Sequence, residues 1–494
     1  MKKVSLLILA VFSLSTLISA QNVDDALRYS RLYYGGTARF MSMGGAFTAL
    51  GGDISSLSQN PAGLGVFRSS EFTISPQLLH NKVDASYNGL SSDYLYNFNL
   101  NQGGLVSNLI SNSNETGLIT LNFGYSFNKT NNLNRSTLIH GEGTTSSIVD
   151  SWALRSEGIL KDDLEDEPGM AYDAWLTNPI TGSGGLSYGT VYSDYGQSAS
   201  VYNQNVRRLI TDEGYTGEHA FSIGGNYSNK VFFGATLGIN RIKFSSHLEH
   251  LESTDNALPT EFKNFTYTDH FENKGTGYAL KMGAIIKPIE AVRIGLAFHS
   301  PTFYSIDETF YKNVTSNFTN GGHHDWSIET QRFRYNLTTP FRALAGVAVQ
   351  IKKIALLSAD YEFVDYSVAR FAEAGDDFDY SEKNLYIKQT LKSASNIRLG
   401  GEVRLNKLYL RSGYGYYGKA FQAGEDNADL DYTSLSFGAG FREKNVSIDF
   451  AYTNISSQEK YFLYPLDDTF DQALANLSTN KNIFTVTLGY KFGY

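Results

Sequence analysis

The sequence contains no cysteine and little proline or tryptophan. Its 494 residues include 9 Pro and 3 Trp, against 46 Gly, 33 Tyr and 32 Phe. The absence of cysteine excludes disulfides, thiolate metal sites and cysteine nucleophiles. The excess of Tyr, Phe and Gly is typical of a chain rich in strands and turns rather than in helices. The composition therefore favours an all-β protein.

Long apolar runs are also scarce, and positive charge is not in excess. The apolar run from Val4 to Ile18 follows Met1-Lys2-Lys3 and precedes Ser19-Ala20, which predicts a signal peptide over residues 1–20. The run is shorter than the roughly 20 residues of a transmembrane helix. We expect the mature chain to begin near Gln21, where no cysteine is available for a lipid anchor. The net charge of −9 disfavours nucleic acid as a partner, because nucleic-acid-binding surfaces are basic.

The segment 484–494 alternates between large apolar and small polar residues. The large residues occupy every second position: Phe484, Val486, Leu488, Tyr490, Phe492 and Tyr494. The positions between them hold Thr, Gly and Lys. A transmembrane β-strand has about 9 to 11 residues, apolar toward lipid and polar toward the lumen. We therefore expect this segment to be the closing strand of an outer-membrane β-barrel.

The same alternation recurs along the chain with the rhythm of a bacterial barrel, in which short periplasmic turns alternate with longer extracellular loops. Asn406-Lys407 and Glu443-Lys444 are two of the short turns. The mean hydropathy of −0.27 is consistent with this, because alternation averages each strand to near neutrality. The predicted strands are 70–80, 93–107, 117–130, 221–227, 233–239, 278–286, 292–298, 343–351, 355–363, 384–405, 408–418, 431–442, 445–456 and 484–494. They form a 14-stranded antiparallel transmembrane β-barrel over residues 70–494.

The long segments between these strand pairs all fall on one side, which we assign as extracellular. They are 131–215, 249–262, 305–327, 371–383, 419–430 and 457–480. The insert 131–215 is too long for a structureless loop. Helical patterns at Ser147 to Leu160 and Met170 to Leu176 predict a small, partly helical cap over the mouth. The acidic stretches 161–167 and 375–379 are expected to be solvated loops, with divalent-ion binding as the alternative.

Residues 21–69 do not show the alternation of strands. They are punctuated by glycines, including Gly44-Gly45 and Gly51-Gly52, which permit unusual backbone conformations and close approach. A flexible linker would explain the glycines, but the segment also holds apolar residues such as Phe40, Phe47 and Leu57. Both properties suit a compact plug, or hatch, folded inside the barrel.

Specific motifs support this division of the chain. Gly36 to Asp53 is followed by Asn60-Pro61-Ala62-Gly63-Leu64, and later matches are Gly295 to Pro301, Ser358 to Glu362 and Asn396 to Arg404. Together they resemble the FadL/TodX family of outer-membrane transporters for hydrophobic compounds such as long-chain fatty acids. The resemblance covers nearly all of the mature chain except the insert 131–215.

The resemblance implies a mechanism and a first set of site residues. In that family the barrel has fourteen strands, displacement of the hatch accompanies ligand release, and a kink in an early strand opens a lateral exit. Gly103-Gly104 and Gly124 are the bend candidates here. Asn60 and Pro61 are expected to form a turn that positions the plug. The hatch and gating residues are Gly44, Gly45, Asn60, Pro61 and Ala62.

Charged side chains on the predicted strands must face the lumen, because Arg or Lys at the lipid-facing midplane costs roughly 2–4 kcal/mol. Mixed signs on neighbouring strands predict a cross-strand ladder that braces the barrel and grips the hatch. Alternatively, some of the cations hold the carboxylate of an amphipathic ligand. The candidates for ligand or hatch contacts are Lys281, Arg293, His299, Asp360, Glu362, Arg398, Arg404 and Arg411, with Glu402, Arg442, Asp449 and Lys491 on the same faces.

We interpret the chain as a passive, hatch-gated outer-membrane transporter of hydrophobic or amphipathic small molecules. The alternative is a non-transporting accessory subunit of a secretion or assembly complex that binds other outer-membrane proteins through its loops, with Trp152 and Trp175 exposed on the cap. A hydrolase at His299-Ser300 or a haem site at His323-His324 has little support. We expect no enzymatic activity, cofactor or metal, and expect outer-membrane lipids and lipopolysaccharide around the barrel.

Overall fold

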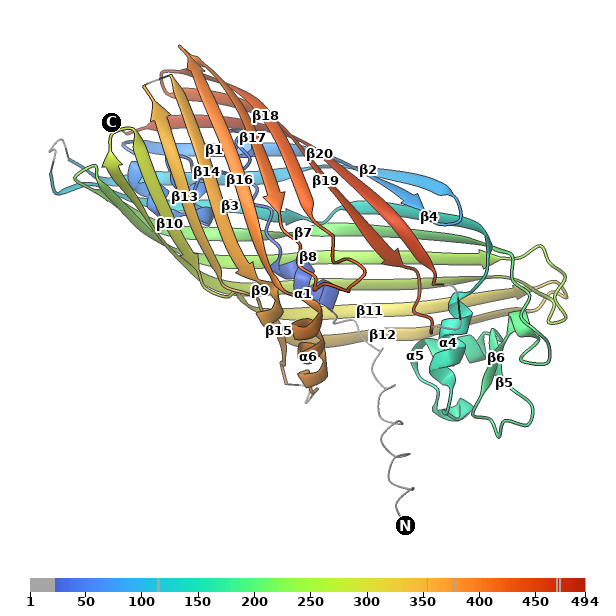
Figure 1. The fold of residues 1–494 in the computed structure, drawn as a ribbon. Helices are drawn as coiled ribbons and strands as arrows, with labels where there is room; N and C mark the ends of the chain where they lie inside the picture. Colours follow the sequence, from blue (N-terminus) through green and yellow to red (C-terminus); the bar gives the residue numbers. More distant parts are fainter. Residues whose placement is uncertain are drawn as a thin grey trace.

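The computed structural model describes residues 23–112, 116–352, 354–375, 378–467, 470 and 472–493. Within them, antiparallel strands form one closed barrel (Figure 1), in which β1 pairs with β20 from Ser70↔Phe492 onward. The fourteen strands of the ring are β1 (Ser70–Ser86), β2 (Leu90–Ser111), β3 (Leu118–Asn132), β7 (Gln204–Tyr227), β8 (Val231–Ser253), β9 (Phe262–Ile289), β10 (Val292–His299), β13 (Arg342–Ile351), β14 (Ala355–Asp365), β16 (Ser393–Leu405), β17 (Leu408–Tyr417), β18 (Tyr432–Glu443), β19 (Val446–Phe462) and β20 (Leu474–Phe492). The predicted fourteen-strand barrel is confirmed.

Four further strands continue this ring after short interruptions. β4 (Arg135–Thr144) continues β3 along β7, and β11 (Phe303–Phe318) continues β10 along β9. β12 (His323–Thr338) leads into β13, and β15 (Arg370–Glu373) follows β14 and pairs with β12. The breaks before β11 and β13 contain Pro301 and Pro340, which have no backbone N–H for a ladder hydrogen bond.

The alternation of side chains behaves as the sequence predicts. On β20 the apolar face of Phe484, Leu488 and Tyr490 is exposed toward lipid, while Thr485 and Thr487 are buried in the lumen. Tyr494, the last residue of the predicted closing strand, lies outside the described residues. Among the residues that are described, no helix is long and apolar enough to cross a membrane.

Two sequence-based expectations need correction on the extracellular side. The segment predicted as strand from 384 begins instead as helix α6 (Ser381–Thr390), and β16 starts at Ser393. Predicted loops such as 305–327 and both ends of 131–215 are largely strand, because β4, β7, β8, β9, β11 and β12 extend beyond the barrel proper. Their outer faces are polar above the membrane, so the apolar alternation that marks a membrane strand disappears there.

The residues before β1 fill the lumen. This hatch contains α1 (Val23–Ser30), α2 (Ala38–Ser42), α3 (Ser56–Gln59) and the 3-10 helix η1 (Pro61–Val66). Most of its apolar residues are buried in three clusters, one around Leu27 and Tyr29, one around Phe40, Met43 and Phe47, and one around Leu57 and Leu64. The predicted signal peptide, residues 1–20, lies outside the described residues.

An extracellular cap, defined as residues 145–203, packs against the ends of the long strands (Figure 1). It contains α4 (Ile148–Ser156), η2 (Lys161–Asp163), α5 (Asp166–Asp173), β5 (Thr177–Pro179), β6 (Tyr188–Thr190) and η3 (Val191–Ser193). A short 3-10 helix η4 (Tyr366–Val368) lies near α6. The core of the cap joins residues of β1, β9, β11 and β20, so the cap closes part of the extracellular mouth.

Candidate functional site

The hatch is held to the wall by a buried carboxylate. Asp360 on β14 accepts hydrogen bonds from the Thr48 backbone N–H at 2.9 Å and from the Thr48 hydroxyl at 2.7 Å. Gln59 donates to the same carboxylate oxygen at 3.3 Å. Because an inward-facing acid of the wall meets two separate parts of the hatch, Asp360 fixes their relative position.

The predicted motif Asn60-Pro61-Ala62 forms the start of η1. The Asn60 side chain accepts from the Ala62 N–H at 3.1 Å, and Pro61 occupies the first position of the helix, where no N–H is needed. The Asn60 amide also donates to the Thr48 carbonyl at 2.6 Å. Gly44 and Gly45 have φ of +62° and +70°, which a side chain would strain. All five residues thus shape the hatch backbone, and only Gly44 and Gly45 line the lumen cavity described below.

The fit of Asn60 against the wall leads to a first prediction. A Cβ at Gly283 of β9 would lie 1.8 Å from the Asn60 side-chain oxygen. We expect Gly283→Ala to displace Asn60, to lower the free energy of unfolding by about 1–3 kcal/mol, and to make the hatch more sensitive to protease. Gly401→Ala is the matched control, because its nearest neighbour would be 3.5 Å away. Equal urea midpoints for the two variants would contradict this account.

Glu362 of β14 is the centre of a buried charge network. It forms ion pairs with Arg342 of β13 and with Arg398 of β16, the latter at 2.9 Å. Arg342 also donates to the Ser30 carbonyl at the end of α1, and the Arg398 guanidinium lies 5.4 Å from the centre of the Tyr34 ring. The network therefore grips the first part of the hatch. Arg342 was not among the residues predicted from the sequence. The strand pattern could have identified it, because Ala343 was predicted to face outward and the residue next to it must then face the lumen.

A second network joins the hatch to the next strands. Glu402 of β16 accepts from Arg39 of α2 at 3.0 Å and from Arg411 of β17 at 2.6 Å. Arg411 also pairs with Asp449 of β19 at 2.6 Å. Arg411 therefore acts on the hatch through Glu402, and its ion pairs among the described residues are both with the wall.

Three further predicted residues bind hatch carbonyl groups directly. Lys281 donates to the Ser58 carbonyl at 2.8 Å and pairs with Glu218 at 2.6 Å. Arg293 donates to the Leu50 carbonyl at 2.7 Å. His299 Nε2 lies 2.7 Å from the Gln59 carbonyl, so this nitrogen carries the proton and donates.

Arg404 differs from its predicted position. Its side chain is exposed beside the β16–β17 turn, donates to the Asn406 carbonyl at 3.1 Å and lies over the Tyr409 ring. Alternation assigned it to the lumen face, but Arg404 is only two residues before the Asn406-Lys407 turn, where the strand has already passed the rim of the barrel. Arg404 is therefore a residue of the periplasmic rim.

The wall has a gap between β2 and β3. Their ladder ends at Gln102↔Asn128, beside the predicted bend at Gly103-Gly104, and residues 90–101 of β2 pair only with β1. A segment of the hatch fills the space: Tyr33 N–H donates to the Thr130 carbonyl at 2.7 Å, and Gly35 N–H to the Lys129 carbonyl at 2.8 Å. A Cβ at Gly35 would lie 2.4 Å from that carbonyl oxygen. The hatch therefore completes the wall at this point.

A cavity lies between the hatch and this part of the wall. The cavity is a narrow slot with a volume of about 860 Å³, the part open to solvent included. Tyrosines, aliphatic residues and three cations line it: Tyr33, Tyr34, Tyr417, Tyr432, Met41, Leu79, Ile455, Ile483, Lys129, Arg398 and Lys481. We call this slot the lumen chamber.

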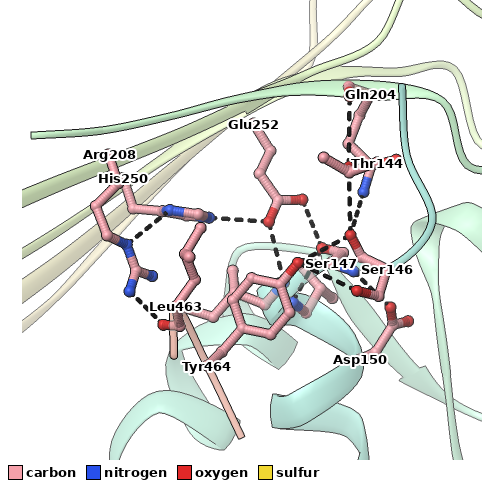
Figure 2. A network of polar contacts seen from close by, with 12 residues as sticks. Thr144, Ser146, Ser147, Asp150, Gln204, Arg208, His250, Glu252, Leu463 and Tyr464 are labelled. Atoms are coloured by element: carbon pink, nitrogen blue, oxygen red, sulfur yellow. Dashed lines mark hydrogen bonds and ion pairs between the residues drawn. The ribbon is translucent and has the colours of Figure 1, made fainter. Parts of the chain in front are cut away.

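The cap is anchored by Glu252 near the extracellular end of β8 (Figure 2). Its carboxylate accepts from the Ser147 hydroxyl at 2.6 Å and from the Ile148 N–H at 3.0 Å, both at the start of α4, and from the Tyr192 hydroxyl at 3.0 Å. His250 Nε2 lies 2.9 Å away. Because Arg208 Nε donates to His250 Nδ1 at 3.1 Å, the imidazole is neutral and donates through Nε2.

A second ionic contact ties α5 to the wall. Glu167 pairs with Arg155 of α4 at 3.1 Å and with Lys312 of β11. Burial alone would raise the pKa of the Glu167 carboxyl, but Lys312 and Arg155 outweigh it and hold the pKa at about 2. The contact is thus fully present above pH ~4.5, the unfolded-state value, and is lost as the pH falls toward 2.

The histidines considered for hydrolysis or haem binding make other contacts in the structure, and the acidic residues that the structure describes form no cluster for a metal ion. His299 is engaged with the hatch, and the Ser300 hydroxyl donates to the Pro301 carbonyl at 2.9 Å, so the two do not form a nucleophile and base pair. His324 stacks on Trp175, and His323 contacts Asn317. Among the described residues, which omit 376 and 377 of the acidic stretch 375–379, no three His, Asp or Glu side chains are placed to hold a metal.

Known proteins share this architecture. A family model described as outer membrane protein transport protein (OMPP1/FadL/TodX) matches residues 193–492. Outer membrane protein P1 of Haemophilus influenzae is 24% identical over 257 residues, covering 49% of this chain and 53% of that protein. The chain thus spans about half the length of the curated relative it matches.

Solved structures agree on the fold. A Pseudomonas aeruginosa FadL homologue has a TM-score of 0.56 at 12% identity, covering 94% of this chain and 100% of that one. The P. putida toluene transporter TodX has a TM-score of 0.53 at 13% identity, covering 93% and 99%. Because the family model spans more than half of the chain and the barrel is shared, this chain is an outer-membrane protein and belongs to the OMPP1/FadL/TodX family of outer-membrane transport proteins.

Proposed function

We propose that the protein carries hydrophobic or amphipathic small molecules of fatty-acid-like chemistry passively across the outer membrane, under control of the hatch. The observation that carries this proposal is the lumen chamber, whose lining combines wall residues such as Ile483 with hatch residues such as Tyr34 and Met41. A ligand in the chamber contacts the hatch directly, so hatch movement changes its binding.

An entry route supports the proposal. A wider vestibule of about 1700 Å³, solvent included, lies above the chamber and is lined by α1, by aromatic residues such as Phe244 and Phe271, and by charged residues. The vestibule and the chamber share Tyr33, Asn131, Tyr432 and Lys481. A slim ligand passing between these side chains reaches the chamber from outside.

The gap between β2 and β3 supports an exit through the wall. The hatch segment 33–36 closes this gap through two backbone hydrogen bonds and through the Asn101 amide, which donates to the Gly36 carbonyl at 2.7 Å. Withdrawal of this short segment breaks these three hydrogen bonds and the ring contacts of Tyr33 and Tyr34 with the wall, and it connects the chamber to the outside of the barrel. The hatch then acts as a gate as well as a plug.

Two lysines of the chamber suit a ligand with an anionic head. Lys129 donates to the Asn99 side chain at 2.6 Å, and Lys481 lies 3.4 Å from the Asn132 carbonyl. Within the described part of the chain, neither ammonium group has a carboxylate partner within 4.0 Å. A fatty-acid carboxylate would supply the missing negative charge, with the tail against the apolar lining.

A second prediction tests transport directly. We expect Ile483→Trp, which fills the chamber, to slow the influx of a fluorescent medium-chain fatty acid into vesicles at least tenfold. Leu488→Trp on the lipid face of the same strand is the matched control and should leave influx unchanged. Both variants must keep the heat-modifiable mobility of a folded barrel. Influx through the wild type no faster than into empty vesicles, or equal influx through both variants, contradicts the proposal.

The alternative function is an accessory subunit that binds other outer-membrane proteins. Trp152, expected on the surface, is instead buried in the cap core, whereas Trp175 is 55% exposed and Trp326 of β12 is 49% exposed. These two tryptophans are suitable anchors for a protein partner. Purification from native membranes distinguishes the two functions, because a stoichiometric protein partner favours the accessory role and a bound lipid favours transport.

A further inference from the structure

The outer face of the barrel changes chemistry abruptly at one level of β8 and β9. On β8 the outward residues are apolar from Val231 to Ile239, and the next two are Arg241 and Lys243, both exposed. With a rise of about 3.3 Å per residue and a tilt near 40°, the apolar stretch is roughly 20–25 Å tall, the height of the lipid-facing band of a barrel. Arg241 and Lys243 therefore lie at the headgroups of the outer leaflet.

The neighbouring strand repeats the change at the same height. On β9 the exposed apolar series through Met282 and Leu280 ends at Tyr278, and the outward residues beyond it are Thr276 and Lys274. Lys274 is exposed. The boundary between apolar wall and cationic rim is thus continuous across two strands.

These cations meet directly across the strand pair. Lys243 is the register partner of Lys274, and Arg241 is the partner of Thr276, to whose hydroxyl it donates. Directly opposed side chains have Cβ atoms about 4.5–5.5 Å apart, and like charges placed so are destabilising. On its other side Lys243 faces Tyr215 of β7, so no acid is opposite it on either neighbour.

The acids near the pair are weakly paired or engaged by another cation: Asp307 of β11, the register partner of Lys274, forms an ion pair with Arg334 at 2.6 Å. Lys274 pairs with Glu272 at 2.8 Å, but both side chains are substantially exposed, and such pairs are weak. Among the described residues, Lys243 has no carboxylate within 4.0 Å. On this face Arg241, Lys243, Lys274 and Arg334 thus stand against three acids, Glu272, Asp307 and Glu213, the last of which is diagonal to Lys243. Within the described part of the chain, Arg241 and Lys243 are the two cations of this face that form no ion pair.

We propose that Arg241, Lys243 and Lys274 bind a phosphate group of an outer-leaflet lipid, the phosphorylated lipid A of lipopolysaccharide. The phosphate lies between the two lysines, and the planar Arg241 guanidinium binds its oxygens in parallel. The acyl chains pack below against Leu237, Tyr278 and Leu280, which are all exposed. The position of the cations directly above an apolar wall selects an amphipathic lipid over a soluble anion.

The test measures binding of bisphosphorylated lipid A to the full-length protein in detergent by native mass spectrometry. Wild type should retain the lipid, and Lys243→Gln/Lys274→Gln should bind it at least tenfold more weakly. Lys407→Gln/Lys444→Gln, which removes the same charge at periplasmic turns, is the control and should bind as wild type. Lys243→Arg/Lys274→Arg should restore binding, which separates loss of charge from loss of fold.

Two further ligands decide what the site recognises. Dephosphorylated lipid A should bind weakly to wild type, with the same affinity that intact lipid A has for the glutamine double variant. Inorganic phosphate at equal concentration should not displace lipid A from wild type. Equal binding of dephosphorylated lipid would show that only acyl chains are held, and full displacement by phosphate would show an anion site without lipid selectivity. Either result overturns the proposal, as does undiminished binding by the glutamine double variant.

Discussion

Replacing Glu362 with alanine is expected to free the hatch from the barrel wall and to lower the free energy of unfolding by about 3–5 kcal/mol. The carboxylate is fully buried and lies between Arg342 and Arg398. Its removal leaves two buried guanidinium groups without a counter-charge, which costs more than the ion pairs contribute. Since Arg342 also binds the end of α1, the loss reaches the hatch and is not confined to the wall.

Two measurements follow the effect of Glu362→Ala. Urea unfolding in detergent reports the stability, and ion current through planar bilayers reports the hatch, with at least tenfold more current expected than for wild type. Glu443→Ala is the control, because its partner Lys407 is at an exposed turn and such a pair is worth less than about 1 kcal/mol. A Glu362→Ala protein with wild-type current and an unchanged urea midpoint would show that the network does not hold the hatch.

Replacing Glu252 with alanine is expected to detach the extracellular cap while leaving the barrel folded. The carboxylate is fully buried and accepts hydrogen bonds from Ser147 and His250 (Figure 2), and also from Ile148 and Tyr192. Leaving several buried donors unsatisfied costs about 1–3 kcal/mol for each. The cap then opens more often, because it loses this anchor and keeps the apolar core, the Glu167 contact and single hydrogen bonds such as that from Ser316 to the Ala174 carbonyl.

Proteolysis of intact cells measures the opening of the cap. Residues 145–203 should be cleaved at least tenfold faster in Glu252→Ala than in wild type, with the barrel band unchanged. Glu249→Ala, on the same strand but exposed and paired with Arg207, should be cleaved as wild type. Equal cleavage of the two variants would mean that the apolar core alone holds the cap.

The sequence predicted the membrane part of the fold well, because lipid demands one outward apolar face on every strand. The same logic explains two of the differences. Above the membrane, β7, β8 and β9 continue with a polar outer face beside β11 and β12, so these parts of the chain were predicted as loop. Residues 381–390 lie beyond the band as well, and nothing there distinguishes the beginning of a strand from helix α6.

The candidate site was partly visible in the sequence. Alternation identified Lys281, His299, Asp360, Glu362 and Arg398 as inward, and each contacts the hatch or a residue that holds it. It failed at Arg404 because the inward face ends at the rim. Glu252 and the gap filled by residues 33–36 had no local signal, since both depend on segments distant in sequence that meet only in the fold.

The wall recognises the hatch largely through its main chain. Arg342, Arg293, Lys281 and His299 all donate to backbone carbonyl groups, of Ser30, Leu50, Ser58 and Gln59. Asn122, Thr120 and Thr236 do the same for Leu64, Gly65 and Leu57. Because these hydrogen bonds go to backbone carbonyl groups, they do not depend on which side chain the hatch carries at each position. Hatch side chains that line the chamber can therefore be substituted while the barrel keeps its hydrogen bonds to the hatch backbone.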